Sequence, residues 1–427
     1  MRVLRLAVAL LASSAGFAAD PPPKLIDAPK PPAGFPTFKI QEVDTGLKIG
    51  YAVIAVDIDG DKKLDIVVVD QHKVVWYQNP TWRKRVILDG KTAPDNVCIT
   101  ALDIDGDKLP ELVVGAAWKP FDTAKAATLQ WLKRGKTLDD EWTMHPIACD
   151  EPTVHRVQAI DTDGDGKPEV VMVPLMGKGA TKEKNWMDGR PVRVVAYKVP
   201  AKNPEKAEAW QPDVLSEELH VVHNFAPFTP AGDKSPMSIM TASYEGYSAI
   251  LLDKAGGKPK TKLVHPGNQA NAAGNRGASE IRVGYIKPVV ERKDRADGAV
   301  VATIEPWHGN EVVVYTGVIG EKPTRTVLDD HLRWGHAVAF ADLDGDGRDE
   351  LVVGVRDNPA KGDPFTEKRG VRVYKRVGDE WERYILEDGG VAVEDLAVAD
   401  LNGDGKPDIV AVGRATGNCR IYWNQGK

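Results

Sequence analysis

A nine-residue acidic loop occurs five times in this chain of 427 residues and constrains its fold more than any other feature. Each copy has the pattern Asp-x-[Asp/Asn]-Gly-Asp-x-x-x-[Asp/Glu], followed by a short apolar run. Side-chain oxygens at loop positions 1, 3, 5 and 9 can surround a hard cation such as calcium. The predicted calcium ligands are Asp57, Asp59, Asp61, Asp65, Asp103, Asp105, Asp107, Glu111, Asp161, Asp163, Asp165, Glu169, Asp342, Asp344, Asp346, Glu350, Asp400, Asn402, Asp404 and Asp408.

The residues after each loop argue against an EF-hand. An EF-hand has its bidentate Glu at position 12 and continues into a helix. Here position 9 is followed by runs such as Ile66-Val-Val-Val69 and Leu351-Val-Val-Gly354, which are typical of strands. The loops therefore belong to a repeated β unit.

The spacing of the loops predicts how many units there are. The first aspartates of successive loops are 46, 58, 181 and 58 residues apart, so the long gap has room for three units. One degenerate copy is expected at 221–240, where Gly232 and Asp233 keep their register but Thr229, Ala231 and Met237 replace acids. A second is expected at 277–304, around an enlarged loop. The total is seven units.

Each unit contains four predicted strands, and the chain ends suggest how the last unit is completed. The last unit stops at 421–423 after three strands, while an unassigned strand, 38–43, precedes the first unit. If this strand supplied the missing one, it would close a ring and protect the sheet edges. We therefore predict an all-β fold, a seven-bladed β-propeller of four-stranded antiparallel blades. The alternative, an open β-solenoid, would not need this terminal strand.

The loops, the apolar strands and the period resemble FG-GAP/VCBS repeats over nearly the whole chain. This resemblance implies calcium-loaded propeller blades, in a superfamily that spans adhesion, sugar binding and catalysis. Several further stretches are similar to secreted bacterial propeller proteins and to the propeller domain of aldos-2-ulose dehydratase, a lyase that acts on keto-sugars. They are 219–225, 277–280, 304–309, 333–336 and 393–396.

The N-terminal segment predicts export. Residues 1–19 combine two arginines, a short apolar core and small residues, which is typical of a signal peptide. Residues 20–36 contain seven prolines and are expected to form an extended tether before the propeller at 37–427. No other segment approaches transmembrane length. The expected location is therefore secreted or periplasmic.

Cysteine usage and charge limit the expected staples and partners. Cys98, Cys149 and Cys419 are predicted to be free thiols, because the first two fall on the inner and outer strands of one blade, beyond disulfide reach. Calcium would then act as the staple. The formal net charge is −6 and no basic cluster is present, which argues against nucleic acid as a partner.

One position of the repeat collects ionisable side chains. Six residues before the first loop position, at the start of each innermost strand, the blades carry Tyr51, Val97, His155, His223, Glu280, His336 and Glu394. Starts of inner strands surround one mouth of the central channel. Three histidines and two glutamates are therefore expected to converge there.

The connections between second and third strands should reach the same rim. They supply His308 as a further candidate catalytic residue, and Glu305, Trp307, Arg356 and Arg414 as candidate substrate-binding residues. Trp307 could stack on a sugar ring, and the arginines could hold an oxyanion. Insertions at 118–128 and 175–190 could roof a pocket.

Two functions remain open from the sequence. Imidazoles and carboxylates at this density suit a channel metal such as zinc or another divalent ion, or general acid–base catalysis by a C–O lyase on a keto- or anhydro-sugar. The alternative is a non-catalytic propeller that binds carbohydrate, another small polar ligand or protein, with a solvated polar channel. An adhesion protein of the integrin type has no support, because no partner domain or spanning segment is evident.

Overall fold

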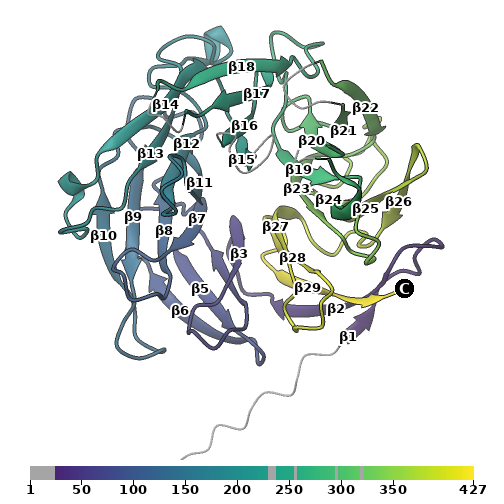
Figure 1. The fold of residues 1–427 in the computed structure, drawn as a ribbon, viewed down its shortest axis with the longest axis horizontal. Coiled ribbons are helices and arrows are strands. Elements are labelled where there is room, and N and C mark those ends of the chain that lie inside the picture. Colours follow the sequence, from purple (N-terminus) through teal and green to yellow (C-terminus); the bar gives the residue numbers. More distant parts are fainter. Residues whose placement is uncertain (1–24, 229–236, 254–256, 294–296, 318–321) are drawn as a thin grey trace, which may run out of the picture.

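The computed structural model describes residues 25–228, 237–253, 257–293, 297–317 and 322–427. Seven antiparallel sheets are arranged in a ring as the blades of a propeller, with their innermost strands around a common centre (Figure 1). Six sheets have four strands, and the seventh gains a short fifth strand. Within the described residues the helical elements are three 3-10 turns, η1 (Lys182–Lys184), η2 (Ala207–Ala209) and η3 (Val289–Glu291).

The strands occupy equivalent places in blades 1 to 7. The innermost strands are β3 (Ala52–Val56), β7 (Cys98–Leu102), β11 (Val154–Ile160), β15 (Asn224–Phe228), β19 (Ile281–Tyr285), β23 (Gly335–Ala341) and β27 (Val393–Ala399). The second strands are β4 (Asp65–Val69), β8 (Glu111–Ala116), β12 (Glu169–Pro174), β16 (Ser238–Ser243), β20 (Ala299–Glu305), β24 (Glu350–Val355) and β28 (Asp408–Gly413). The third strands are β5 (Lys73–Gln78), β9 (Thr128–Lys133), β13 (Val192–Tyr197), β17 (Gly246–Leu251), β21 (Glu311–Thr316), β25 (Gly370–Val377) and β29 (Cys419–Gly426). The outer strands are β6 (Arg83–Asp89), β10 (Thr143–Ile147), β14 (Pro212–Leu219), β18 (Lys260–His265), β22 (Thr324–Asp329), β26 (Glu380–Ile385) and β2 (Thr37–Asp44).

The ring closes through the N-terminal strand, as predicted. Strand β2 pairs antiparallel with β29, which places Phe38 opposite Asn424 and Gln41 opposite Ile421. Strand β1 (Leu25–Asp27) adds to the outer edge of β2. Blade 7 is thus built from both ends of the described chain, which confirms the seven-bladed propeller and excludes the open solenoid.

The described part of the region predicted as a tether, 25–36, packs on the propeller. Strand β1 lies within it, and the Phe35 side chain is buried against Tyr384 of blade 6 with ring centroids 5.8 Å apart. The predicted signal peptide, 1–19, lies outside the described residues. So does most of the degenerate loop of blade 4, although β15 and β16 flank it as expected.

Burial explains why the blades pack. The second strands are buried along their whole length in every blade, as their Val/Ile-rich sequences require when both faces meet neighbouring blades. Outer strands are more polar and less buried than the second strands. Cys98, Cys149 and Cys419 are free thiols, as predicted. Among the described residues, no helix is long and apolar enough to span a bilayer.

Candidate functional site

The aligned position at the start of the inner strands does bring its histidines and glutamates together. In three blades this residue is the extra one of a β-bulge, because the strand register shifts around His155, His336 and Glu394. A bulge re-aims a side chain relative to regular alternation. In blades 4 and 5, His223 and Glu280 come immediately before the strand begins. All five side chains are almost fully buried.

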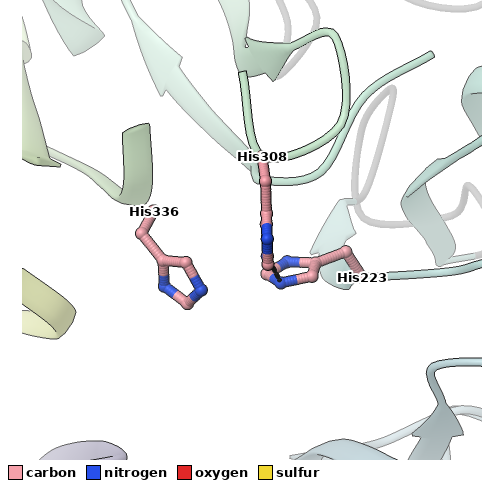
Figure 2. A group of neighbouring side chains, drawn as sticks. All are labelled: His223, His308 and His336. Atoms are coloured by element: carbon pink, nitrogen blue, oxygen red, sulfur yellow. Dashed lines mark hydrogen bonds between the residues drawn. The ribbon is translucent and has the colours of Figure 1, made fainter. Parts of the chain in front are cut away.

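Three imidazoles form the centre of the cluster. His223, His308 and His336 approach one another from blades 4, 5 and 6, with ring centroids 4.5 to 5.1 Å apart (Figure 2). One ring nitrogen from each lies within 4.8 Å of the others, so the group could hold a metal ion. His308 reaches the cluster from the connection after β20, in a left-handed backbone conformation with φ of 49°. His155 joins the edge of the group, 4.5 Å from His223 by ring centroids.

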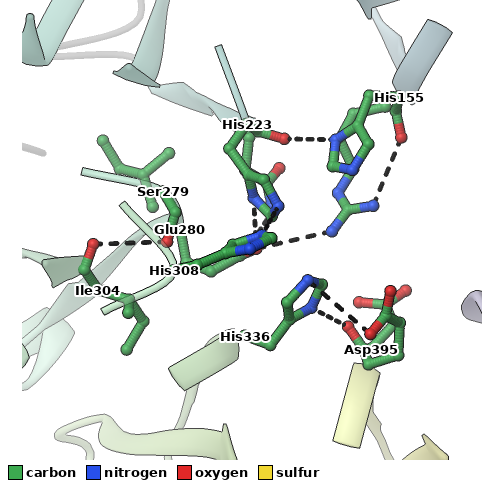
Figure 3. A network of polar contacts seen from close by, with 12 residues as sticks. His155, His223, Ser279, Glu280, Ile304, His308, His336 and Asp395 are labelled. Carbon is green, nitrogen blue, oxygen red and sulfur yellow. Dashed lines mark hydrogen bonds and ion pairs between the residues drawn. The ribbon is translucent and has the colours of Figure 1, made fainter. Parts of the chain in front are cut away.

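The Nδ1 atoms of His155, His223 and His336 each lie close to an oxygen (Figure 3). His155 Nδ1 lies 3.0 Å from the carbonyl oxygen of His223, and His336 Nδ1 lies 2.6 Å from that of Glu394. Since a carbonyl only accepts, both Nδ1 atoms must be protonated. His223 Nδ1 lies 2.9 Å from Glu280 Oε1, within ion-pairing distance. The neutral rings of His155 and His336 therefore keep their Nε2 lone pairs available, which is the usual arrangement of metal-binding histidines.

Burial keeps these rings neutral. It holds the pKa of His155, His223, His308 and His336 well below the ordinary value of a histidine, and nearby arginine charges act in the same direction. In the structure, His308 Nε2 lies 2.6 Å from His223 Nε2. One of these two Nε2 atoms therefore carries the proton that the other accepts when nothing else is bound between them.

Two buried carboxylates flank the imidazoles. Glu280 accepts a hydrogen bond from Asn224 and lies 3.6 Å from Arg156 Nη2. Glu394 Oε1 accepts from Arg414 Nη1 at 2.6 Å, whereas Glu394 Oε2 is buried, has no hydrogen-bond partner and lies 3.9 Å from His336 Nε2. Burial raises the pKa of both carboxyls. Glu394 thus presents to the histidine cluster an oxygen that accepts no hydrogen bond and lies 3.9 Å from Arg356 Nη1.

Three of the four predicted substrate-binding residues lie at the histidine cluster, and one does not. Arg356 and Arg414 do lie at the cluster, at 3.9 Å and 2.6 Å from Glu394, although this pairing already uses part of each guanidinium. Trp307 is also there, but one face of its indole stacks on His308 with a centroid distance of 4.0 Å. Glu305 is not: its carboxylate accepts from Tyr315 and Arg325 inside blade 5. Alternation along β20 turns it away from the channel.

The insertions of blades 2 and 3 contact one another at the rim. Phe121 stacks on Trp186 with ring centroids 5.1 Å apart, and Gly179 N donates to Thr123 O at 3.1 Å. Asn185 continues the contact to the carbonyl oxygens of Ala272 and Gly274 before blade 5. The insertions of blades 2 and 3 are therefore joined to the connection between blades 4 and 5.

Sequence reasoning missed several members of the site. Arg156 and Asp395 directly follow aligned residues, and in a regular strand they would point to the opposite face. Trp118, by contrast, begins an insertion predicted to roof a pocket, and its ring centroid lies 5.8 Å from that of His155 and 6.1 Å from that of Tyr51. The adjacency of charged residues in His155-Arg156 and Glu394-Asp395 was the available signal.

The acidic loops lie at the other end of the blades, because each joins the far end of an inner strand to the second strand. The seven-residue strand β11 separates His155 from its loop by about 20 Å. In each loop the first aspartate accepts backbone N–H groups from its own turn, as Asp57 does from Gly60 and Lys62. The ninth residue is buried in all five loops. Carboxylate oxygens in the loops of blades 1, 2 and 3 lie within 4.8 Å of one another.

Comparison with known proteins fits this architecture. Models of FG-GAP and FG-GAP-like repeats match residues 57–114, 334–365 and 392–420. The chain contains FG-GAP repeats. The model of the aldos-2-ulose dehydratase β-propeller domain matches residues 126–318, which include His155, His223, Glu280 and His308.

The chain is also similar to two individual proteins, one by sequence and one by fold. It is 27% identical over 387 residues to aldos-2-ulose dehydratase of Phanerodontia chrysosporium, covering 82% of this chain but only 40% of that protein. A chain in the crystal structure of BBS1N in complex with ARL6DN, soaked with mercury, has a TM-score of 0.52 at 14% identity. That match covers 91% of this chain and 96% of the other, and it shows the propeller fold alone.

Proposed function

We propose that this FG-GAP propeller is a metal-dependent C–O lyase that removes water from a keto- or anhydro-sugar at the channel mouth. One observation carries the proposal: three imidazoles converge so that one nitrogen of each could share an ion, and the Nδ1 atoms of His336 and His223 lie against a carbonyl and a carboxylate oxygen. The similarity to the propeller domain of a dehydratase supports the substrate class.

The residues present fit a divalent transition metal. His223, His308 and His336 would hold it through nitrogen, which suits zinc, with Glu280 orienting His223. When bound, the ion would supply Lewis-acid polarisation of a substrate carbonyl. The chain itself provides a largely buried cluster of neutral imidazole nitrogens and two buried carboxylates.

Glu394 is the candidate base. Its Oε2 accepts no hydrogen bond and lies 3.9 Å from His336 Nε2, and the burial that raises the pKa of Glu394 also makes it a stronger proton acceptor. It would take the proton from the carbon next to the carbonyl, and the electron pair of that C–H bond would become a C=C bond. The C–O bond of the neighbouring carbon then breaks, and Glu394 returns the proton to the departing hydroxyl, so the products are an enone and water.

We further propose that the acidic loops bind calcium and that the protein is exported. The loop positions 1, 3, 5 and 9 supply the oxygen ligands that calcium prefers. Calcium in these loops would stabilise the blades at the end opposite the histidine cluster.

An assay with 1,5-anhydrofructose and with a 3-keto-glucoside tests the lyase. The expected result is an enone product, seen by its ultraviolet absorbance, with wild-type protein and none with His223→Ala or His336→Ala. No product from either substrate, together with ligand binding on a glycan array, would favour the non-catalytic carbohydrate-binding propeller instead.

A further inference from the structure

One position of the third strand lies beside the acidic loop in every blade that has one. The second and third strands pair up to the residue just after the loop, for example Leu351 with Tyr374 in blade 6. The next residue of the third strand then faces the loop. This loop-facing position holds Gln78, Lys133, Lys198, Lys375 and Trp423 in blades 1, 2, 3, 6 and 7.

The loop-facing side chain contacts loop position 3 wherever that position is a charged aspartate. In four blades position 3 is Asp, and the loop-facing side chain donates to it: Gln78 to Asp59 at 2.6 Å, Lys133 to Asp105 at 3.0 Å, Lys198 to Asp163, and Lys375 to Asp344. In blade 7 position 3 is the neutral Asn402, and the apolar Trp423 faces the loop. Trp423 instead donates to Gln41.

Blade 6 differs from the other blades in how far its lysine enters the loop. The Lys375 ammonium contacts Asp344 and lies 3.2 Å from both Asp346 Oδ2 and Glu350 Oε1, the residues of positions 3, 5 and 9. Its side chain is only 10% exposed, against 49% for Lys133 and 65% for Lys198. Lys427 adds a second ammonium 2.9 Å from Asp344 Oδ2.

These contacts place an ammonium where the loop would hold an ion. An ammonium has three N–H donors and here faces three carboxylates, so its donors are matched. Calcium would need the same oxygens and would sit beside a positive charge. Removing that charge to solvent would break three ion pairs of a nearly buried side chain. The exposed Lys133 and Lys198 can swing away at little cost.

We propose that Lys375 is the resident cation of the blade 6 loop and keeps calcium out of it. The inference rests on the proposed calcium binding by the other loops. It predicts about four loop calcium ions per chain rather than five, with blade 6 stapled by its own lysine and therefore insensitive to calcium removal.

Calcium stoichiometry of the full chain, measured by equilibrium dialysis with radioactive calcium, tests this proposal. Wild type should bind about four ions, and Lys375→Met should bind one more, because methionine has similar length without the charge. Lys133→Met and Lys198→Met are matched controls and should not change the number. Five ions in wild type, or no gain in Lys375→Met, would overturn the proposal that Lys375 keeps calcium out of the blade 6 loop. No calcium in wild type would overturn the calcium proposal itself.

Amine labelling of the wild-type protein gives a second measurement that needs no variant. Acetylation followed by mass spectrometry should leave Lys375 unmodified with calcium and with chelator, while Lys133 and Lys198 are modified. Labelling of Lys375 that appears when calcium is added would mean that calcium displaces it, and would overturn the proposal.

Discussion

At the scale of single residues, the oxygens close to the Nδ1 atoms of His223 and His336 should orient these rings for metal binding. Replacing Glu280 by Gln should keep the fold but raise the metal dissociation constant roughly 10- to 100-fold, because the carboxylate that orients His223 is lost. Competition with a chromophoric chelator measures this. Glu245→Gln is a matched control, since Glu245 lies 2.9 Å from His220 Nδ1 outside the cluster. Equal effects of both substitutions would contradict the assignment.

Glu394 should matter for turnover rather than for metal binding. Glu394→Gln removes the proposed base and is expected to lower kcat by about 100- to 10,000-fold while metal content stays unchanged. Steady-state kinetics and elemental analysis of the same sample check both parts. Glu387→Gln is the control, because Glu387 also pairs with an arginine, Arg420 at 2.8 Å, but away from the cluster. A Glu394→Gln enzyme with near wild-type kcat would refute this role.

The residue types of the cluster could be predicted from the aligned repeat, but their exact orientation could not. A single register shift at His155 or Glu394 reverses the side-chain alternation, and nothing in the local sequence marks a bulge. Glu305 shows the opposite failure. It stands beside Trp307 and His308 in sequence, yet strand alternation gives its carboxylate to Arg325.

At the scale of the elements, each acidic loop combines a turn with a candidate ion site. Asp65 is fully buried and accepts the N–H groups of Ile58 and Asn79 at 3.0 and 2.8 Å, so it joins two segments of blade 1 without any ion. Asp61 instead sits in the exposed part of the loop and accepts from Lys63.

These two residues should therefore respond differently to chelator. In EDTA, Asp65→Ala should lower the free energy of unfolding by about 1–3 kcal/mol for each buried N–H that it strands, whereas Asp61→Ala should change it little. With calcium, both should lose ion-derived stability. Urea unfolding in the two buffers measures this. If Asp65→Ala lost as little stability in EDTA as Asp61→Ala, Asp65 would stabilise the blade only through calcium.

The strands were predictable because Val/Ile-rich runs with a fixed period leave few alternatives. The rim was not, since the insertions at 118–128 and 175–190 have no repeat to align. Their contact through Phe121 and Trp186 depends on the three-dimensional positions of two blades.

At the scale of the whole molecule, one outer strand from the N-terminus holds the ring shut. Phe38 of β2 is 3% exposed and packs in the core between blades 6 and 7. Phe38→Ala should lower the free energy of unfolding by about 3–5 kcal/mol, because it leaves a cavity at the closure. Its neighbour Lys39 is partly exposed, so Lys39→Ala should cost far less. Similar losses in denaturant unfolding would argue against closure as a main source of stability.

The blade count and the terminal closure followed from the sequence because the repeat fixes the number of strands, and the leftover strand at 38–43 had one open edge to fill. The edge strand β1 was not predicted, because it pairs with β2, and β2 takes its place only when the ring closes.

The central claim is that the channel mouth holds a transition metal on His223, His308 and His336. Elemental analysis of the purified wild-type protein and of a His223→Ala/His308→Ala/His336→Ala variant tests it most directly. We predict about one transition-metal ion per chain in wild type, its loss in the variant, and the same calcium content in both. No transition metal in wild type, or equal amounts in wild type and variant, would contradict the claim.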